Sequence, residues 1–277
     1  MSFKTLPLRR ALETNLLDSL STDYDLFDEY LDTLQIRIYE GDTVLNEFLD
    51  LNDLYTEQDI AGIIVNGNLV VNAPIIDFEP DTYSCFLLVS GSLTCTRLAA
   101  GCAEILVNGD VNVADVMVAY YNHGNIQVAG DLNAELLIID DHGATIKGNI
   151  NAATFCRGWQ IPAADYTTWK SILLPEIATQ LLDEDHYLFA GDVRFLKLLG
   201  EGTPVFKPSL QQLSADNNPA PQVVGFDTIK PLVQHLPGRY EDYPMAMVEK
   251  MPERDELKFL FYNGTTVLEE LDLDDPA

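Results

Sequence analysis

The chain has 277 residues, of which 44 are acidic and 16 are basic, so its formal net charge at neutral pH is −28. A field of this sign repels nucleic-acid phosphates and anionic lipid headgroups, which argues against nucleic acid or a membrane surface as the partner. The sequence contains no run of 18 or more uncharged apolar residues, so no membrane-spanning helix is expected.

The first expected elements are two helices between Thr5 and Leu34. Apolar residues recur there every three or four positions, and a cap signal at residues 21–23 divides the segment. We expect residues 1–60 to form a helical cap that shields the open end of a stack of strands. Within this cap, residues 35–39 alternate like a strand, and residues 44–54 fit either a return strand or a short helix.

A five-residue phrase recurs five times between residues 62 and 150. Each copy has an apolar residue, a variable residue, glycine, a second variable residue that is polar, and another apolar residue. The glycines are Gly67, Gly91, Gly109, Gly130 and Gly148, at intervals of 24, 18, 21 and 18 residues. A period near 20 with one strand signal per period is typical of a stacked β-solenoid.

Residues 61–156 are therefore predicted to form a right-handed parallel β-helix of about five coils, and the fold class is mainly β. The five glycines should occupy equivalent corners, either because the corner needs positive φ or because it leaves no room for a Cβ. The longest interval, between Gly67 and Gly91, contains an acidic turn at Asp77–Asp81. We expect this turn to be an exposed loop, a common place for partners to bind.

The repeated phrase resembles the coils of the bactofilin-type, polymer-forming group of right-handed β-helix proteins. The similarity covers residues 62–156, about a third of the chain. It implies a parallel β-helix and, for the family, end-to-end stacking into polymers. Here the helical N-terminal segment and the long C-terminal region are expected to cover the ends of the rod, so we predict that the protein does not polymerise.

After Cys156 the pattern changes, and residues 157–277 are predicted to form a smaller α+β region. Helical spacing over 163–182 is interrupted by Pro175, and the sequence at 189–193 repeats the phrase and suggests one further strand. Residues 209–221 are the best linker candidate. Helical pieces are expected at 226–236 and 240–260, and the acidic run at 269–275 fits either a frayed terminus or a docking strip.

No catalytic motif is present: the sequence has no nucleophile elbow, no phosphate-binding loop and no cysteine pair with zinc spacing. His123 and His142 are expected to stack at one corner, either as turn residues or as a metal or acid–base pair. We predict no catalytic residues, no metal and no cofactor. The four cysteines (Cys85, Cys95, Cys102 and Cys156) are expected to be buried thiols, and without a signal peptide they favour a cytoplasmic location.

Acidic residues are concentrated in the first part of the chain. Between Ala11 and Ile146 there are 24 acidic residues against two basic ones, a net charge of −22. Such a field attracts basic proteins, although it fits a role in solubility alone equally well. The whole profile, acidic, cytoplasmic and without catalytic motifs, resembles bacterial immunity proteins that neutralise secreted toxins. This resemblance implies a basic toxin or nuclease domain as the partner.

The predicted partner contacts are acidic residues of the N-terminal segment and of the long loop, together with two adjacent tyrosines. Neighbouring residues of a strand face opposite sides, so one tyrosine should point outward, where tyrosines favour protein binding. The residues are Asp23, Asp25, Asp28, Glu29, Asp32, Asp77, Glu79, Asp81, Tyr120 and Tyr121. Two other functions stay open, a structural polymer-forming protein and a solenoid enzyme that acts on a polysaccharide or an acyl substrate.

Overall fold

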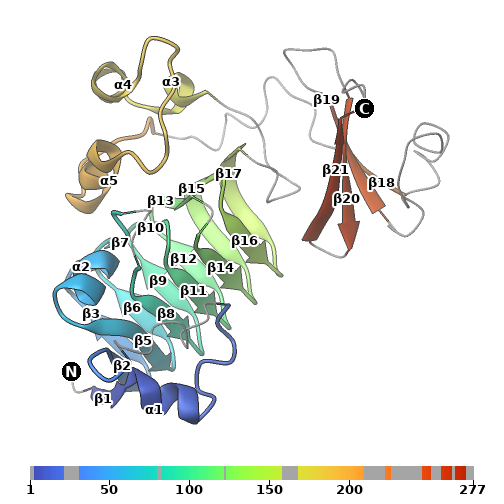
Figure 1. Ribbon diagram of the computed structural model, residues 1–277. Helices are drawn as coiled ribbons and strands as arrows, with labels where there is room; N and C mark the ends of the chain where they lie inside the picture. The colour runs from blue at the N-terminus through green and yellow to red at the C-terminus, as the bar shows by residue number, and fades with distance from the viewer. Residues whose placement is uncertain are drawn as a thin grey trace.

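The computed structural model describes residues 3–21, 31–79, 83–121, 123–157, 168–208, 222–225, 245–250, 257–263 and 266–272. Within these residues the protein is mainly β, and its principal element is a parallel β-solenoid of six coils (Figure 1). Each coil has three sides. In the last two coils one long strand bends around a corner and forms both the second and the third side. The predicted fold class is confirmed.

Each side of the solenoid is a ladder of parallel strands. The first side contains β2 (Gln35–Glu40), β5 (Ile60–Asn66), β8 (Phe86–Val89), β11 (Glu104–Val107), β14 (Asn125–Val128) and β16 (Gly143–Ile146). The second side contains β3 (Thr43–Leu45), β6 (Leu69–Val71), β9 (Leu93–Cys95) and β12 (Val111–Val113). The third side contains β4 (Leu49–Asp50), β7 (Ile75–Ile76), β10 (Leu98–Ala100) and β13 (Val116–Tyr120). Two longer strands, β15 (Leu132–Asp140) and β17 (Ile150–Arg157), continue both the second and the third side.

The interior is apolar because each coil places aliphatic residues at the same inward positions. One column runs through Leu69, Leu93, Val111, Leu132 and Ile150, which pair in register from coil to coil. The first four side chains are buried, and Ile150, in the last coil, is partly exposed. A single coil could not remove this surface from water, so the stability of the solenoid comes from contacts between neighbouring coils.

The five repeat glycines lie one above another at the corner between the first and second sides, which we call the glycine corner. From Gly91 onward, each glycine N–H donates to the carbonyl oxygen of the glycine one coil earlier, over 2.9–3.0 Å. A Cβ atom on any of the five would lie only 2.5–2.8 Å from the backbone of the preceding glycine. None of the five has positive φ. The corner therefore requires glycine for close backbone approach, the second of the two expected reasons.

The polar residue after each glycine forms a second ladder along the same corner. An oxygen of each side chain accepts a hydrogen bond from the backbone N–H of the equivalent residue in the next coil. The five bonds join Asp42 to Asn68, Asn68 to Ser92, Ser92 to Asp110, Asp110 to Asp131, and Asp131 to Asn149, over 2.7–3.1 Å. This ladder explains why the phrase requires a short polar residue after the glycine.

The solenoid begins at β2, well before residue 61. Strands β2, β3 and β4 pair in parallel with β5, β6 and β7, so they form a first coil that the sequence analysis assigned to the cap. Residues Tyr39–Thr43 are a sixth copy of the phrase, centred on Gly41, with tyrosine and threonine in the two apolar positions. Residues 44–54 contain both expected alternatives, the end of β3 with β4, and the start of helix α2 (Leu51–Thr56).

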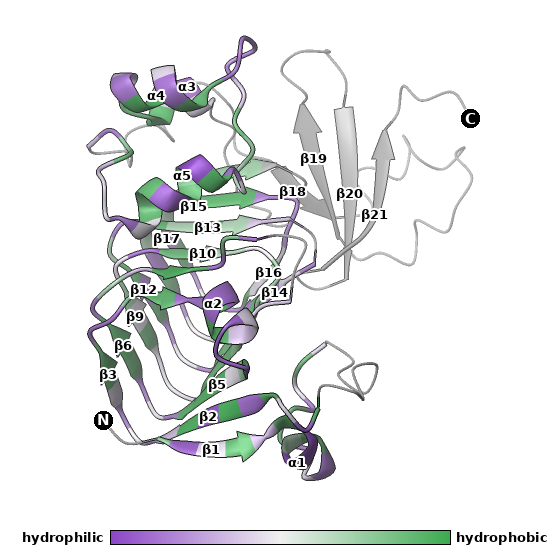
Figure 2. Cartoon of the chain, turned by 60° about the vertical axis from the view of Figure 1, so that its left-hand side comes forward, coloured by the Kyte–Doolittle hydropathy of each residue, from purple (hydrophilic) through white to green (hydrophobic). Residues whose placement is uncertain are grey.

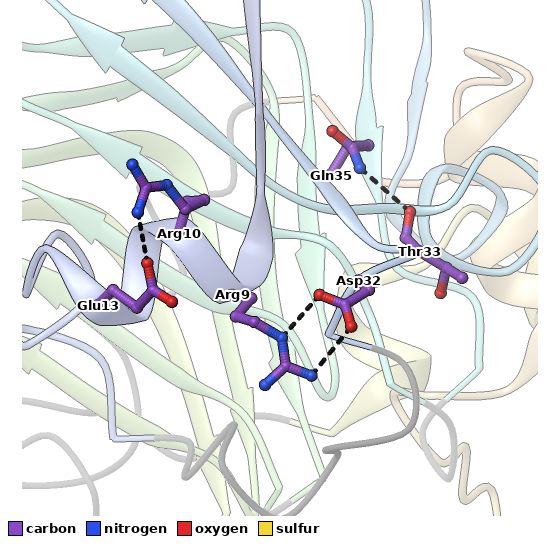
Figure 3. A network of polar contacts seen from close by, with 6 residues as sticks. All are labelled: Arg9, Arg10, Glu13, Asp32, Thr33 and Gln35. Atoms are coloured by element: carbon purple, nitrogen blue, oxygen red, sulfur yellow. Dashed lines mark hydrogen bonds and ion pairs between the residues drawn. The ribbon is translucent and has the colours of Figure 1, made fainter.

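The N-terminal segment covers the outer surface of the first side. It starts with a strand, β1 (Lys4–Pro7), which pairs antiparallel with β2, and continues as helix α1 (Leu8–Glu13). Leu8 and Leu17 pack against Ile64 and Phe86 on that surface. Ion pairs fix the segment, among them Arg9 with Asp32 at 2.6 Å (Figure 3). The prediction that residues 5–34 are helices is wrong at β1, and its second helix lies largely in residues 22–30, outside the described residues.

The described part of the predicted cap leaves most of the open end uncovered. Strand β1 covers only the edge of β2. Within the described residues, β3 and β4 are the outermost strands of their sides and have no strand beneath them. The physical reason is that the apolar residues of the N-terminal segment match an apolar outer surface on the first side, where their burial stabilises the contact.

Three short helices cover the outer surface of the third side: α3 (Trp169–Ile172), α4 (Pro175–Leu181) and α5 (Val193–Gly200). They contact an apolar outer face formed by β10, β13 and β15, coloured green in Figure 2, with Trp169 and Phe195 at the centre of the contact. Pro175 occupies the first turn of α4, where proline is well tolerated. The prediction of a further strand at 189–193 is wrong, because Asp192 instead caps α5.

Four strands near the C-terminus form a separate antiparallel sheet: β18 (Gln222–Gly225), β19 (Met245–Lys250), β20 (Leu257–Asn263) and β21 (Thr266–Asp272). The predicted helix at 240–260 is therefore wrong. Strand β20 begins inside the predicted helix and continues past it, and it contains Phe259, Phe261 and Tyr262, aromatic residues that favour strands. The acidic run forms a strand as far as Asp272. The linker at 209–221 and the helix at 226–236 lie outside the described residues.

Candidate functional site

Five of the ten predicted contact residues are described, and of these the structure brings Asp77 and Tyr120 together in the interior instead of on a surface. Asp32 is exposed, and its carboxylate is bound by Arg9, whose hydrogen bond lowers the pKa of the carboxyl. Glu79 is exposed at the start of the long loop. The remaining acidic candidates apart from Asp77 lie outside the described residues: Asp23, Asp25, Asp28, Glu29 and Asp81.

Asp77 is fully buried, so the prediction that it contacts a partner is wrong. Its Oδ2 accepts hydrogen bonds from three consecutive backbone N–H groups, those of Gly101, Cys102 and Ala103, over 2.7–3.1 Å. Its Oδ1 accepts one from the hydroxyl of Ser84 at 2.7 Å. Burial raises the pKa of this carboxyl, and the hydrogen bonds act in the opposite direction. Asp77 therefore holds together the corner between the third and first sides, which we call the variable corner.

Asn52, in helix α2, fixes the two ends of the long loop. Its side-chain amide donates to Ser84 Oγ at 2.8 Å and accepts from the backbone N–H groups of Phe78 and Glu79. A single buried side chain thus ties the first coil to the loop of the second coil. The position of Glu79 beside α2 follows from this connection.

The two tyrosines are placed differently from the prediction. Tyr120 is fully buried, packs on Phe189, and its hydroxyl donates to the carbonyl oxygen of Asp77, so its role as a contact residue is wrong. Burial raises the pKa of its phenol. Tyr121 is half-buried, with φ of 67°, and its ring contacts His123 edge to face at 4.6 Å. The backbone turns here because Tyr121 leaves the strand in a left-handed conformation.

The two histidines lie at the variable corner but do not stack. His123 is exposed, whereas His142 is fully buried beneath Gly124. Nδ1 of His142 is 2.8 Å from the carbonyl oxygen of Gly143, and its Nε2 has no hydrogen-bond partner. Burial lowers the pKa of His142 to about 4, so its imidazole is neutral at physiological pH. No group of three or more histidine, cysteine or acidic residues in the described chain could hold a metal ion.

The cysteines are free thiols, as expected. Cys85, Cys95 and Cys156 are buried and Cys102 is half-buried. Burial raises the pKa of Cys95 to about 12, which makes its thiol a poor nucleophile. In the part of the chain that the structure describes, no helix is long and apolar enough to cross a membrane.

The first coil carries the densest negative charge of the solenoid. Between residues 35 and 59 there are seven acidic residues and one basic residue, whereas residues 84–102, which contain the third coil, include no acidic residue. The seven are distributed over all three corners of the coil: Glu40, Asp42, Glu47, Asp50, Asp53, Glu57 and Asp59. Six of them are exposed, and Asp50 is half-buried as the N-cap of α2. Sequence reasoning missed this ring because it placed residues 35–59 in a cap.

A cavity lies in the first coil at the open end of the interior, and Glu47 of the ring lines it. The cavity has a volume of about 330 Å³, and core residues such as Tyr39, Leu49 and Ile63 line it. Phe3 and Val44, which also line it, are 44% and 48% exposed. An apolar centre inside a polar rim is the usual arrangement of a protein interface. We call this surface, the acidic ring with the cavity, the open end.

Arg37 is the one basic residue of the first coil, and it occupies an inward position. The residues paired in register above it are aliphatic, beginning with Ile63 and Leu87. Its guanidinium group lies 5.2 Å from the centre of the Phe3 ring and donates to Gln58 Oε1 at 2.8 Å. Gln58 in turn donates to Asp53 at 2.7 Å. The guanidinium group tolerates contact with water, and it covers part of the exposed core.

A second cavity, of about 480 Å³, lies among the C-terminal helices. Its walls include Leu173 and Leu182, and its polar groups include Lys170 and Lys207. The ammonium group of Lys207 is already bound to two backbone carbonyl oxygens at 2.8–3.0 Å, and that of Lys170 lies 3.2 Å from His186 Nε2. The backbone therefore binds the ammonium group of Lys207, and His186 lies within hydrogen-bonding distance of Lys170.

Comparisons of this chain with protein-family models, with curated proteins and with solved structures find no match.

Proposed function

We propose that the protein binds and occludes a basic protein partner through its open end, as an immunity protein of the cytoplasm that neutralises a toxin of the nuclease type. The observation that supports this proposal is the ring of acidic residues in the first coil, together with a cavity in that coil lined by core side chains and by polar groups that include Glu47. A nuclease holds its substrate phosphates in a cationic groove, and an acidic surface is complementary to such a groove.

The two parts of the open end would have different roles. The acidic ring would steer the partner and raise the association rate, an effect that salt screens over about 8–10 Å. The cavity would accept an apolar anchor of the partner, and such buried anchors contribute most of the binding energy at interfaces. Like charges around one coil repel one another, and a cationic partner would offset this repulsion.

The experiment that tests the proposal is a measurement of binding kinetics at low and high salt. The partner to test is the product of the adjoining gene, because the gene of an immunity protein lies beside that of its toxin. The variant is the triple substitution Glu47→Gln, Asp53→Asn and Glu57→Gln, which removes three charges from the ring. We expect its association rate at low salt to fall severalfold, with a smaller loss at high salt. The matched control is Glu184→Gln, Asp185→Asn and Glu201→Gln, three exposed residues of the helical segment.

The outcome of the control decides the interpretation. If both triple variants slow association equally, net charge acts without a specific surface. If neither variant nor salt changes the rate, the charge serves solubility and the electrostatic mechanism fails. A growth assay with the toxin co-expressed measures neutralisation directly, and failure to restore growth contradicts the immunity function.

A structural, polymer-forming role is the second candidate, because several end strands have no described neighbour on their outer edge. Within the described residues β3 and β4 have no strand beneath them, and β16 and β17 have none above them. End-to-end stacking would need all three sides to match, and β1 already occupies the edge of β2. We therefore expect no filaments in light scattering or electron microscopy at tens of micromolar protein. Filaments of the full-length chain would favour the structural role.

A further inference from the structure

Within the residues that the structure describes, no strand pairs with the outer edge of β3 at the open end. Thr43 N–H donates to Asn68 O, and Leu45 O accepts from Asn72 N–H, both over 2.8 Å, so these residues direct their backbone groups toward the second coil. Alternate residues of a strand direct their N–H and C=O groups to opposite edges. The backbone N–H and C=O of Val44, between them, therefore face away from the solenoid.

The neighbouring side of the same coil shows how such an edge is covered. There β1 lies antiparallel along β2, with four residue pairs from Lys4 with Ile38 to Pro7 with Gln35. The protein thus already covers one of the three lower edges by adding a strand. The edge of β3 is the corresponding position on the second side, and no described strand occupies it.

The cavity lies directly beside this free edge. Val44 and Leu45 of β3 line it, together with Asn46 and Glu47 that follow. A strand that paired with β3 would carry side chains on alternating faces, so one of them could enter the cavity. The volume of about 330 Å³ leaves room for one large apolar side chain.

The charges around the edge select the kind of strand. Asp42 precedes β3 and Glu47 follows it, and both are exposed. A strand with lysine or arginine on either side of its apolar residue would place cations beside these carboxylates. An acidic strand would be repelled by them, and so would a second copy of this first coil.

We propose that the basic partner binds by adding a β-strand to the free edge of β3, with one large apolar side chain in the cavity and flanking cations beside Asp42 and Glu47. This inference rests on the proposed function and adds the mode of recognition. Backbone hydrogen bonds of Val44 supply affinity, and the cavity with its acidic rim supplies specificity.

The test uses the full-length protein and a blocked heptapeptide of alternating lysine and valine with a central phenylalanine. In Val44→Pro the free-edge N–H is lost while the bonds of Thr43 and Leu45 to the second coil remain, and proline is tolerated at edges. We expect the heptapeptide to bind about tenfold more weakly, as the loss of one or two hydrogen bonds predicts. Val44→Thr, which keeps the N–H and the branched shape, should bind almost normally.

Two further measurements keep the test independent of folding defects. Binding should slow hydrogen exchange of the Val44 amide in the unaltered protein, and a heptapeptide with N-methylated backbone amides should not bind. Unchanged affinity in Val44→Pro, or unchanged exchange at Val44, overturns strand addition. If binding still depends on salt and on the acidic ring, the proposed function survives that result. If no basic probe or partner binds, both proposals fail.

Sedimentation measurements test whether a second copy of the protein, instead of a basic partner, occupies the edge of β3. A dimer of the unaltered protein that Val44→Pro dissociates would show that a second copy occupies β3, and this result overturns the basic partner as its occupant. A monomer in both cases agrees with the proposal.

Discussion

The glycine corner and the variable corner join the same coils but are built in opposite ways. At the glycine corner the connections between strands are two or three residues long in every coil, and backbone packs on backbone. At the variable corner the connections range from two residues, 141–142, to nine, 77–85. The difference shows that a repeated fold can keep one corner uniform while the other corner accepts insertions, if individual buried polar groups satisfy the backbone.

The largest expected effect is at the variable corner. Replacing Asp77 by alanine leaves three backbone N–H groups and the Ser84 hydroxyl buried without their acceptor. We expect a loss of about 4 kcal/mol in the free energy of unfolding, measured by urea denaturation. The control is Glu79→Ala, an exposed carboxylate two residues along, which should change stability by less than about 0.5 kcal/mol. Equal effects of the two would mean that the buried network is not formed.

At the glycine corner we expect a loss of about 3 kcal/mol for Gly109→Ala. The added Cβ would lie 2.8 Å from the backbone of Gly91, so the coils must separate locally. Gly143→Ala is the matched control, because its Cβ would have no neighbour closer than 3.6 Å. Thermal denaturation of both variants tests the difference. Unchanged thermal stability of Gly109→Ala would contradict the close stacking of the glycine corner.

The buried histidine of the variable corner makes stability depend on pH. The folded state favours the neutral imidazole of His142, with a pKa of about 4 against an ordinary value of 6.5. Between these values the unfolded chain binds the additional proton, so stability falls as the pH is lowered through this window. From pH 7 to pH 5 the contribution of His142 is about 2 kcal/mol. We expect His142→Gln to lose less stability over this range than the unaltered protein, whereas His123→Gln should behave as the unaltered protein does.

The smallest expected effect is the loss of one hydroxyl group at the variable corner, where Tyr120 is compared with its neighbour Tyr121. Tyr120→Phe removes the hydroxyl that donates to the carbonyl oxygen of Asp77 and keeps the ring contact with Phe189. We expect a loss of about 1 kcal/mol in calorimetry. Tyr121→Phe, at the half-buried neighbour, serves as the control. A larger loss at Tyr121 than at Tyr120 would show that the outer hydroxyl, and not the inner one, supports the corner.

The sequence predicts the glycine corner well, because close backbone packing requires a glycine in every coil and the glycine therefore recurs in the sequence. It does not predict the first coil, where Tyr39 and Thr43 replace the aliphatic residues of the phrase although Gly41 and Asp42 keep its centre. The burial of Asp77 was also beyond prediction, since its three donors lie in the next coil, 24 to 26 residues along the chain. The acidic ring was not predicted because it exists only once residues 35–59 are wound into a coil.

The two ladders of the glycine corner have a direction that bears on synthesis. In each rung the acceptor, a glycine carbonyl or a polar side chain such as Asn68, belongs to the earlier coil, and the donor belongs to the later one. A chain emerges from the ribosome with its N-terminus first. Every completed coil thus presents these acceptors, together with backbone donors such as Leu69 N–H, to the segment that emerges next. Nascent chains arrested after successive glycines should therefore become resistant to protease one coil at a time, in the order of translation.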